Sequence, residues 1–331
     1  MKEFKKIAVI GGGSWATAIV KMLTENQDSI SWWMRNEDTI DHIKKYGHNP
    51  NYISAAQLDQ SKLDISSDIN HIVGEADCIV FAVPSAFLKS TLKMLTVSLE
   101  NKFVISAIKG IIPENNAIIG DYLHSKYDIS FQNIGVLTGP CHAEEVALER
   151  LSYLTVACED ITKAEWFADK IKCRYIKTNV SEDIFGTEIA AVLKNVVAIA
   201  SGICHSIGYG DNFQAVLASN AIREIKRFVD GVHPIKRDIK ESAYLGDLLV
   251  TVYSQFSRNR TFGNMIGKGY SVKSAQLEMN MIAEGYYAVK CIKEINDQHQ
   301  IDMPITDAVY HILYQKMSPL IEMRLLADRL N

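Results

Sequence analysis

This chain has few cysteines, no excess of basic residues and no low-complexity segment. Its six cysteines lie at least 15 positions apart, so none has the two-residue spacing of a zinc ribbon or a redox pair. We therefore expect reduced thiols and no metal site. Lysine and arginine number 35 against 39 aspartates and glutamates, a net charge of −4. This balance argues against a general nucleic-acid binder, because such proteins need a clustered cationic surface.

Long hydrophobic runs are also missing. The longest candidate, Ile189–Ala200, is interrupted by Lys194 and is too short to cross a bilayer. At the N-terminus, the apolar segment Ile7–Ile10 is too short for the core of a signal peptide. The sequence therefore predicts no membrane span and a cytoplasmic location.

What the chain does have is the composition of a globular protein of two domains. Hydrophobic residues make up 47% of its 331 residues, and domains average roughly 150 residues. The first part alternates helical stretches, such as 86–99, with apolar runs typical of buried parallel strands, at 5–10, 29–34, 77–83, 103–107 and 133–137. The second part has helical periodicity at 185–206, 213–229, 241–256 and 272–297. We expect an α/β protein, with a Rossmann-like, doubly wound parallel sheet over residues 1–180 and an all-α domain over 181–331.

A glycine turn follows the first predicted strand. The segment Gly11-Gly12-Gly13-Ser14-Trp15-Ala16 fits the pattern G-x-G-x-x-A and opens a predicted helix. In a dinucleotide site, Gly11 permits the tight turn and Gly13 lets the backbone approach a pyrophosphate. A turn that only joins a strand to a helix is the alternative, but the position at the first strand of an alternating pattern favours dinucleotide binding.

The second predicted strand lacks the acidic residue that usually binds the ribose of NAD. The segment Ser31–Asn36 has no carboxylate before Glu37 and offers Arg35 instead. A guanidinium there matches the 2′-phosphate of NADPH. Arg35 on an open surface is the alternative, so the sequence favours NADPH without excluding NADH.

Lys194 interrupts a helix that is otherwise apolar nearly all round. Such a helix should be buried, and burial lowers the pKa of a lysine, which makes its amine usable as a general base near neutral pH. The alternatives are a lysine that reaches water or one that pairs with Glu188 or another acid.

Other polar residues stand where ligands could bind. Lys109 follows a buried strand, and Thr138–Ala143 follows another, with Gly139 able to permit close backbone approach. His142 in that segment is more typical of a structural histidine than of a catalytic base. Asp247 and the run Ser257-Arg258-Asn259-Arg260 could grip a phosphate, or could form an ordinary capped helix end.

Together these segments closely resemble the soluble bacterial-type NAD(P)-dependent glycerol-3-phosphate dehydrogenases. The resemblance covers nearly the whole chain, in the family's order. It is carried by Gly11–Ala18, Ser106–Ile111, Leu137–Pro140, Leu193–Val196, Gly210–Asn212, Leu245–Leu248 and Ser257–Gly263.

The resemblance implies reversible hydride transfer between NAD(P)H and dihydroxyacetone phosphate, giving sn-glycerol 3-phosphate for phospholipid synthesis, in a homodimer. Lys194 would be the catalytic proton acceptor and donor. Residues implied to bind substrate are Lys109, Gly139, Cys141, Lys194, Asp247, Ser257, Arg258 and Asn259. Those implied to bind the cofactor are Gly11, Gly13, Ser14, Trp15, Arg35, Lys109, Ala143, Arg258, Ile282 and Glu284.

Four positions depart from the family pattern. Ala16 replaces a glycine, which the A-ending fingerprint tolerates, and Cys141 replaces a serine or threonine with a weaker hydrogen-bond donor. Tyr244 stands where glycine is expected and Ser152 where proline is usual. Two rivals also stay open: a ketopantoate or β-hydroxyacid reductase, which would bind a carboxylate, and a redox sensor that holds a dinucleotide without turnover.

Overall fold

The chain folds into two compact units in a computed structural model that describes residues 4–279 and 283–331. The N-terminal unit comprises the residues up to Ile108 together with Ile119–Ile184, and the helical unit comprises Lys109–Ile118 with Phe185–Asn331. The expected first domain, 1–180, includes Lys109–Ile118. That segment instead packs with the helical unit, whose core contains Ile111 and Ile118.

A single mixed sheet forms the centre of the N-terminal unit. Its strands, among the described residues, are β1 (Ile7–Ile10), β2 (Ile30–Trp33), β3 (Leu63–Ser66), β4 (Cys78–Phe81), β5 (Phe103–Ser106), β6 (Ile134–Thr138), β7 (Ser152–Cys158) and β8 (Ile176–Ser181). They lie in the order β3-β2-β1-β4-β5-β6-β7-β8. The five predicted strands are present, and β3, β7 and β8 were missed. The sequence predicts a parallel sheet. This is wrong for one pair of strands, because β7 runs antiparallel to β6.

Burial explains which strands the sequence revealed, except for β7, which was missed although it is buried at six of its seven positions. Strands β1, β2, β4, β5 and β6 are buried at every position, so they read as continuous apolar runs. In β3 only Ile65 is buried, and in β8 only Ile176. Short edge strands with mostly polar residues give no such signal.

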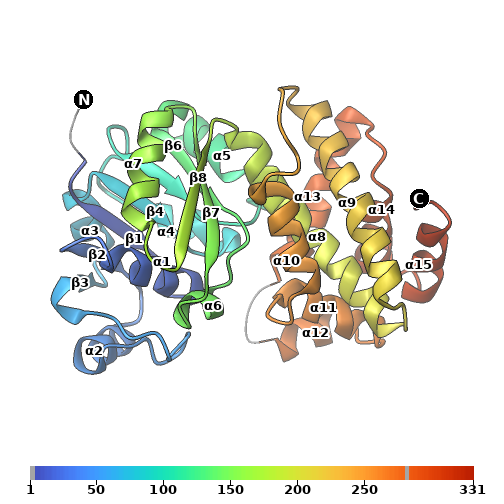
Figure 1. The fold of residues 1–331 in the computed structure, drawn as a ribbon, viewed down its shortest axis with the longest axis horizontal. Coiled ribbons are helices and arrows are strands. Elements are labelled where there is room, and N and C mark those ends of the chain that lie inside the picture. The colour runs from blue at the N-terminus through green and yellow to red at the C-terminus, as the bar shows by residue number, and fades with distance from the viewer. Residues whose placement is uncertain (1–3, 280–282) are drawn as a thin grey trace. The chain divides into compact units, whose positions relative to one another are not determined.

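Helices cover both faces of the sheet (Figure 1). They are α1 (Ser14–Thr24), α2 (Glu37–Tyr46), α3 (Ile69–Glu75), α4 (Ser85–Leu92), α5 (Ile119–Tyr127), α6 (Ala143–Ala147) and α7 (Ile161–Ile171), with 3₁₀ turns at Gln60–Lys62 and Phe131–Asn133. Ile7 and Val9 of β1 share one core with α1 and α7, while Ala8 and Ile10 are buried on the opposite face. Helix α4 ends at Leu92, earlier than expected.

The sheet order indicates the end of β1 as the place where a ligand should bind. Strand β1 pairs with β2 on one side and with β4 on the other, both in parallel. In open sheets of this kind, ligands bind outside the carboxyl ends of the strands, at the point where the strand order reverses. The glycine turn after β1 lies at that point.

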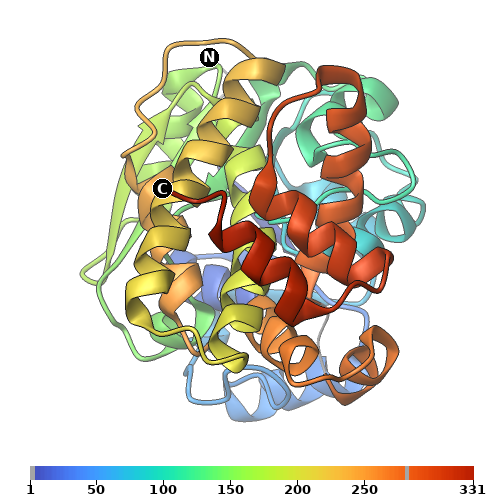
Figure 2. The same ribbon diagram turned by 90° about the vertical axis from the view of Figure 1, so that its right-hand side faces the viewer.

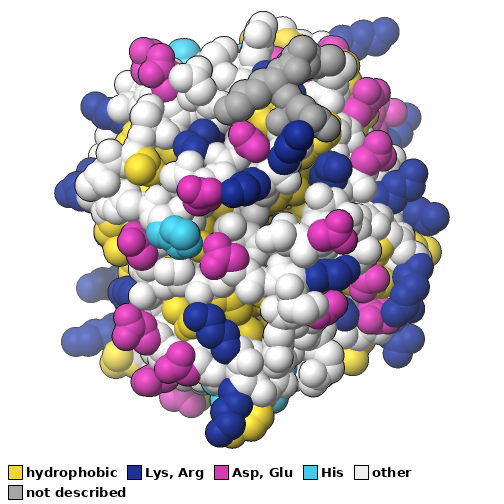
Figure 3. All heavy atoms as spheres, turned by 90° about the vertical axis from the view of Figure 1, so that its left-hand side faces the viewer, with side chains coloured by type: hydrophobic (Ala, Val, Ile, Leu, Met, Phe, Trp, Pro, Cys, Tyr) yellow, Lys and Arg dark blue, Asp and Glu magenta, His cyan; other side chains and the backbone are white. Residues whose placement is uncertain are grey.

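The face that Figure 3 shows carries acidic and basic side chains in a mixture. Several ion pairs are exposed, such as that of Lys6 with Glu75 at 2.7 Å. Exposed pairs of this kind contribute little to stability.

The helical unit is all-α, as the sequence predicted. Its helices are α8 (Ile184–Ser206), α9 (Asp211–Val232), α10 (Asp247–Tyr253), α11 (Arg258–Gly267), α12 (Val272–Glu278), α13 (Glu284–His299), α14 (Pro304–Tyr314) and α15 (Pro319–Ala327). A π-helical turn, Ser242–Gly246, precedes α10. The predicted helix 272–297 is therefore two helices, α12 and α13. Figure 2 shows α9, α14 and α15 on the side of this unit that faces the viewer.

Helix α8 is long and apolar enough to cross a membrane by length and composition alone. In the folded chain, however, 94% of its most apolar window is buried, and residues such as Val196 and Ile199 belong to the core of the helical unit. The composition of α8 is therefore what a central core helix requires.

Glycines allow α8 and α11 to touch through their backbones. A Cβ atom on Gly202 would overlap the carbonyl oxygen of Arg260, and one on Gly263 would overlap that of Ile199. This close crossing holds the start of α11 against α8, about two turns from Lys194.

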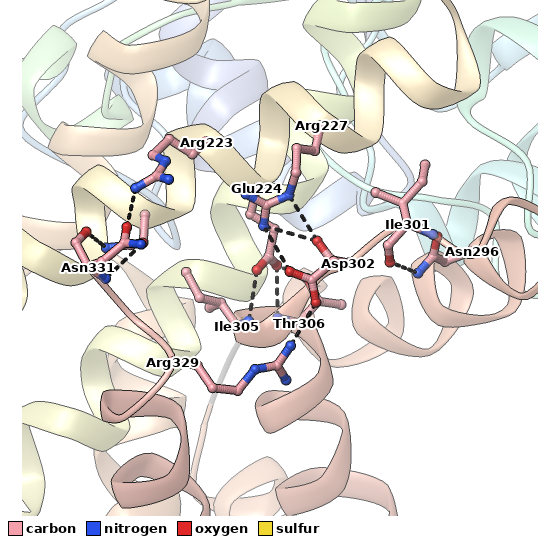
Figure 4. Close-up of polar contacts among 11 residues, drawn as sticks. Arg223, Glu224, Arg227, Asn296, Ile301, Asp302, Ile305, Thr306, Arg329 and Asn331 are labelled. Carbon is pink, nitrogen blue, oxygen red and sulfur yellow. Dashed lines mark hydrogen bonds and ion pairs between the residues drawn. The ribbon is translucent and has the colours of Figure 1, made fainter.

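A buried carboxylate ties α9 to α14 (Figure 4). Glu224 accepts the backbone N–H groups of Ile305 and Thr306, at 2.8 and 2.9 Å, and the Thr306 hydroxyl at 2.7 Å. Helix α14 has no side-chain cap from its own N-cap residue, Met303, so Glu224 supplies the cap from a distant helix. Burial raises the pKa of Glu224 to about 7, against the lowering effect of these hydrogen bonds.

Candidate active site

The predicted site residues fall into two groups, one in each unit. The glycine turn, Arg35 and the segment after β6 belong to the N-terminal unit. Lys109, Lys194, Asp247 and the start of α11 belong to the helical unit.

The glycine turn has a backbone that other residues rarely adopt. Gly11 has a φ of +139°, and a Cβ there would lie 2.7 Å from the carbonyl oxygen of Ala82, just after β4. Only glycine fits this left-handed, crowded position. The tight turn that the sequence pattern predicts is therefore present.

The start of α1 offers the groups that bind an anion. Its N-cap, Gly13, supplies no side-chain cap, and the first turn has no acidic residue. A Cβ on Gly13 would meet no described atom within 4 Å. The first N–H groups of a helix, with its positive dipole end, form a ready anion site. Ser14 and Trp15 occupy the first positions of this helix, so these residues fit the pyrophosphate of a dinucleotide.

Arg35 lies two positions after the end of β2 and is exposed. Its neighbour Asn36 caps α2 by accepting the backbone N–H of Thr39 at 2.8 Å, and Glu37 accepts the hydroxyl of Ser67 at 3.0 Å. Among the described residues no carboxylate forms an ion pair with Arg35. The guanidinium therefore fits the 2′-phosphate that distinguishes NADPH from NADH.

The segment after β6 is shaped by its own sheet. Gly139 has a φ of +119°, and a Cβ there would lie 2.8 Å from the carbonyl oxygen of Tyr153 in β7. The close approach that Gly139 permits is thus with β7. Cys141 is buried and Ala143 begins α6. Their predicted contacts with substrate and cofactor stay predictions, as does the structural interpretation of His142.

Lys194 lies at the centre of a buried polar cluster in the helical unit. Its Nζ donates to Oδ1 of Asp247 at 2.5 Å and to the hydroxyl of Thr251 at 3.0 Å. The ammonium of Lys109 donates to the other carboxylate oxygen of Asp247 at 3.3 Å. The Lys194 residue is only 5% exposed, so it does not reach water, and its acid partner is Asp247.

Burial and the neighbouring charges set the protonation of this cluster. Burial lowers the pKa of Lys194 to about 7, Asp247 opposes that shift, and Lys109 adds to it. Burial also raises the pKa of Asp247, but the two ammonium groups outweigh it and the net direction is downward. The buried amine of Lys194 can therefore lose its proton near neutral pH.

Local structure aims these side chains at one another. A π-helical turn ends directly before Asp247, and such turns are often found at functional sites. Asn195, next to Lys194, donates its amide to the carbonyl oxygen of Lys109 at 2.8 Å. The backbone of Lys109 is therefore fixed to α8 beside the lysine that its side chain faces.

The start of α11 shows structural roles for two predicted substrate residues. Ser257 is the N-cap, and its hydroxyl accepts the backbone N–H of Arg260 at 3.3 Å. Asn259 accepts the backbone N–H of Gly285 at 2.9 Å. A Cβ on Gly285 would lie 2.6 Å from the carbonyl oxygen of Asn195, so Asn259 lies close to the Lys194 region. The neighbouring Glu284 begins α13.

Two residues of the buried polar cluster around Lys194, Thr251 and Asn195, were not predicted as site residues. Thr251 follows Asp247 by four positions, so both lie on one face of α10; that spacing is the signal that could have found it. Asn195 lies in the family segment Leu193–Val196, which by itself indicates no contact with Lys109. Ile282, a predicted cofactor residue, lies outside the described residues.

The departures from the family pattern fit the fold. Ala16 is fully buried in the core of the N-terminal unit. Ser152 donates its backbone N–H to the carbonyl oxygen of Tyr175 at 2.9 Å, a bond that proline could not make. Tyr244 is buried within the π-helical turn.

Comparison with known proteins decides between the rivals. A family model described as NAD-dependent glycerol-3-phosphate dehydrogenase N-terminus matches residues 6–164, and one described as the C-terminus of the same enzyme matches residues 183–323. The chain belongs to this family. It is therefore an NAD(P)-dependent oxidoreductase. The alternatives of a ketopantoate or β-hydroxyacid reductase and of a redox sensor are excluded.

Individual members of the glycerol-3-phosphate dehydrogenase family align over almost the whole chain. The enzymes named glycerol-3-phosphate dehydrogenase [NAD(P)+] from Staphylococcus carnosus and Macrococcus caseolyticus are each 34% identical, over 319 and 312 residues, covering 94% of this chain and 94% of theirs. The crystal structure of glycerol-3-phosphate dehydrogenase from Coxiella burnetii has the same fold, with a TM-score of 0.88 at 24% identity over 98% of this chain and 99% of that one. The reaction is the family's hydride transfer between NAD(P)H and dihydroxyacetone phosphate.

Proposed function

We propose that this chain interconverts dihydroxyacetone phosphate and sn-glycerol 3-phosphate with Lys194 as its general acid and base. The observation that carries this proposal is the buried Nζ of Lys194, held between Asp247 and Thr251. A lysine whose pKa is lowered to about 7 exists in both protonation states near neutral pH, as acid–base catalysis requires.

Proton transfer at Lys194 accompanies each direction of the reaction. The hydride comes from the nicotinamide of bound NAD(P)H. During reduction, the Lys194 ammonium gives its proton to the carbonyl oxygen on which negative charge develops. During oxidation, the neutral amine accepts the proton of the substrate hydroxyl.

Asp247 and Lys109 tune and orient that lysine. The pKa of Asp247 is lowered, so the carboxylate stays ionised and holds one N–H of Lys194 in a fixed direction. Thr251 holds a second N–H. The positive charge of Lys109 favours the neutral form of Lys194 and would also stabilise an oxyanion on the substrate.

The substrate phosphate is proposed to bind at the start of α11. Arg258, the first residue of that helix, is exposed, and the first turn contains no acidic residue. Guanidinium groups and helix N-termini both favour phosphate. Ser257 and Asn259, with Gly139 and Cys141 from the N-terminal unit, are the further substrate residues that we propose.

The cofactor is proposed to bind the glycine turn, with NADPH preferred over NADH. Gly11, Gly13, Ser14 and Trp15 would hold the pyrophosphate, and Arg35 the 2′-phosphate, for the reasons of geometry given above. By family position, further cofactor contacts come from Lys109, Ala143, Arg258, Ile282 and Glu284.

We further propose a cytoplasmic homodimer that supplies glycerophospholipid synthesis. The family resemblance supports all three statements. Within the structure, the outer side of α15 supports association, because Leu320, Ile321 and Leu325 there are 59%, 55% and 55% exposed. Exposed apolar side chains in one place are typical of association surfaces.

Initial rates with defined substrates test the proposed reaction. The decrease in absorbance of NADPH, and in a separate assay of NADH, is followed with dihydroxyacetone phosphate as the substrate. Ketopantoate and a β-keto acid serve as control substrates. We expect turnover with dihydroxyacetone phosphate alone. Turnover with a keto acid instead, or none with any substrate despite dinucleotide binding, would refute the proposal.

A further inference from the structure

Each of the three carbonyl oxygens in the glycine turn accepts a hydrogen bond from the protein. The indole N–H of Trp32 donates to Gly11 at 2.6 Å. The amide of Asn49 donates to Gly12 at 3.1 Å, and the hydroxyl of Thr17 donates to Gly13 at 3.0 Å. A carbonyl oxygen that is held by a donor is not free to turn toward a phosphate, which would repel it.

Asn49 holds the carbonyl of Gly12 directly and reaches that of Gly13 through Thr17, whose backbone N–H also donates to Gly13 at 3.0 Å. Its amide donates to the carbonyl of Gly12 and, at 2.9 Å, to the hydroxyl of Thr17. That hydroxyl in turn donates to Gly13. A hydrogen-bond relay therefore runs from Asn49 through Thr17 to the last glycine of the turn, where α1 begins.

The side chain of Asn49 is held in a fixed position by its surroundings. It is fully buried, in the loop after α2, and its Oδ1 accepts the backbone N–H of Asn51 at 3.1 Å. Both amide hydrogens and the carbonyl oxygen of the side chain are thus used. An aspartate would place a carboxylate oxygen against the carbonyl of Gly12, and an apolar residue would leave that carbonyl without its donor.

We infer that Asn49 is a positioning residue for the dinucleotide. It holds the carbonyl of Gly12 in place and supports that of Gly13 through the Thr17 hydroxyl, so that the N–H groups of the turn and of the first turn of α1 stay available to the pyrophosphate. The inference rests on the cofactor binding proposed above. Asn49 itself does not touch the cofactor; it acts through the backbone of the turn.

Direct binding measurements on Asn49→Ala test the inference. NADPH fluorescence titration gives its dissociation constant, and initial rates give KM and kcat. We expect the Kd and KM for NADPH to rise roughly 10-fold, the size expected from losing a buried hydrogen bond. Turnover at saturating NADPH and the KM for dihydroxyacetone phosphate should hold, because Lys194 is untouched. A purely structural role would instead lower the melting temperature and the active fraction without changing Kd.

Asn51→Ala is the matched control, since it removes an amide from the same loop and keeps the backbone N–H that Asn49 accepts. Within residues 4–279 and 283–331 its side chain donates to Thr39 alone, at 3.1 Å, so the Kd for NADPH should not change. Thr17→Val breaks the relay from the other end and should also raise the Kd. It decides the question if Asn49→Ala does not fold.

The outcomes separate this inference from the proposed reaction. An unchanged Kd in Asn49→Ala, or in Thr17→Val where the first variant is unfolded, overturns the role of Asn49. A wild-type chain that binds NADPH but does not reduce dihydroxyacetone phosphate overturns the proposed reaction and leaves the comparison of Kd values intact. A wild-type chain that binds neither NADPH nor NADH overturns both.

Discussion

At the scale of single residues, the chemistry depends on one lysine kept out of water. The carboxylate of Asp247 stabilises its ammonium, while burial and Lys109 favour its neutral amine. These opposing effects bring the pKa of Lys194 to about 7, where the amine can both give and accept a proton.

Replacing Lys194 with methionine should abolish most of the activity. The variant keeps the length of the side chain but removes the proton donor and acceptor, so kcat should fall by roughly 10²- to 10⁴-fold. Lys293→Met is the control, since Lys293 forms an ion pair of 2.6 Å with Asp307 elsewhere in the helical unit and should leave kcat unchanged. Equal kcat values in wild type and Lys194→Met would refute the acid–base role.

The pH profile should report the same group. Oxidation of sn-glycerol 3-phosphate needs the neutral amine, so its kcat should rise with pH through about 7, while kcat for the reverse reduction should fall. In Asp247→Asn the carboxylate that raises the pKa of Lys194 is lost. The rising limb should then move to lower pH in stopped or continuous rate assays, and a limb that stays in place would contradict the assignment.

Arg35 should decide the choice of cofactor. Arg35→Ala removes the proposed partner of the 2′-phosphate, so the KM for NADPH should rise roughly 10-fold or more while the KM for NADH changes little. Arg174, an exposed arginine that pairs with Glu149 in the same unit, provides the control as Arg174→Ala. Equal losses for both cofactors would show that Arg35 does not read the phosphate.

At the scale of elements, contacts between helices position the site. Gly202 and Gly263 let the backbones of α8 and α11 touch, and Asp247 at the start of α10 accepts a hydrogen bond from Lys194 of α8. The start of α14 is held by Glu224 from α9 (Figure 4). Each device joins segments far apart in the sequence.

Loss of the Glu224 cap should destabilise the helical unit. Glu224→Ala leaves two backbone N–H groups and a hydroxyl without their buried acceptor, which should lower the free energy of unfolding by about 2–4 kcal/mol. Lys226→Ala, on the same helix, breaks an exposed ion pair with Asp230 and should change it by less than about 0.5 kcal/mol. Urea unfolding followed by circular dichroism gives both values, and a Glu224→Ala curve that overlays the wild type would contradict the role of the cap.

At the scale of the whole molecule, the proposed state is a homodimer. Sedimentation equilibrium at micromolar concentration should give twice the chain mass of 37.0 kDa. The exposed apolar side chains of α15 should then become protected on association. A single species at the mass of one chain would rule the dimer out.

Local signals were enough for the sequence to determine much of this protein. The glycine turn, the buried strands and the apolar helix around Lys194 each depend on short-range backbone geometry and on the periodicity of burial. From them, and from the resemblance that their motifs carry, came the Rossmann-like unit, the all-α unit and the family.

Tertiary structure alone decided the rest, because it depends on packing between distant segments. Lys194 meets Asp247 53 positions away, and Lys109 meets the same carboxylate across 138; no local pattern encodes those pairings. Packing between distant segments also decides three other features. Strand β7 runs antiparallel to β6, Lys109–Ile118 belongs to the helical unit, and Asn49 donates a hydrogen bond to the glycine turn. Residue types set what each segment could do, and burial against a particular neighbour selected which of those possibilities the folded chain uses.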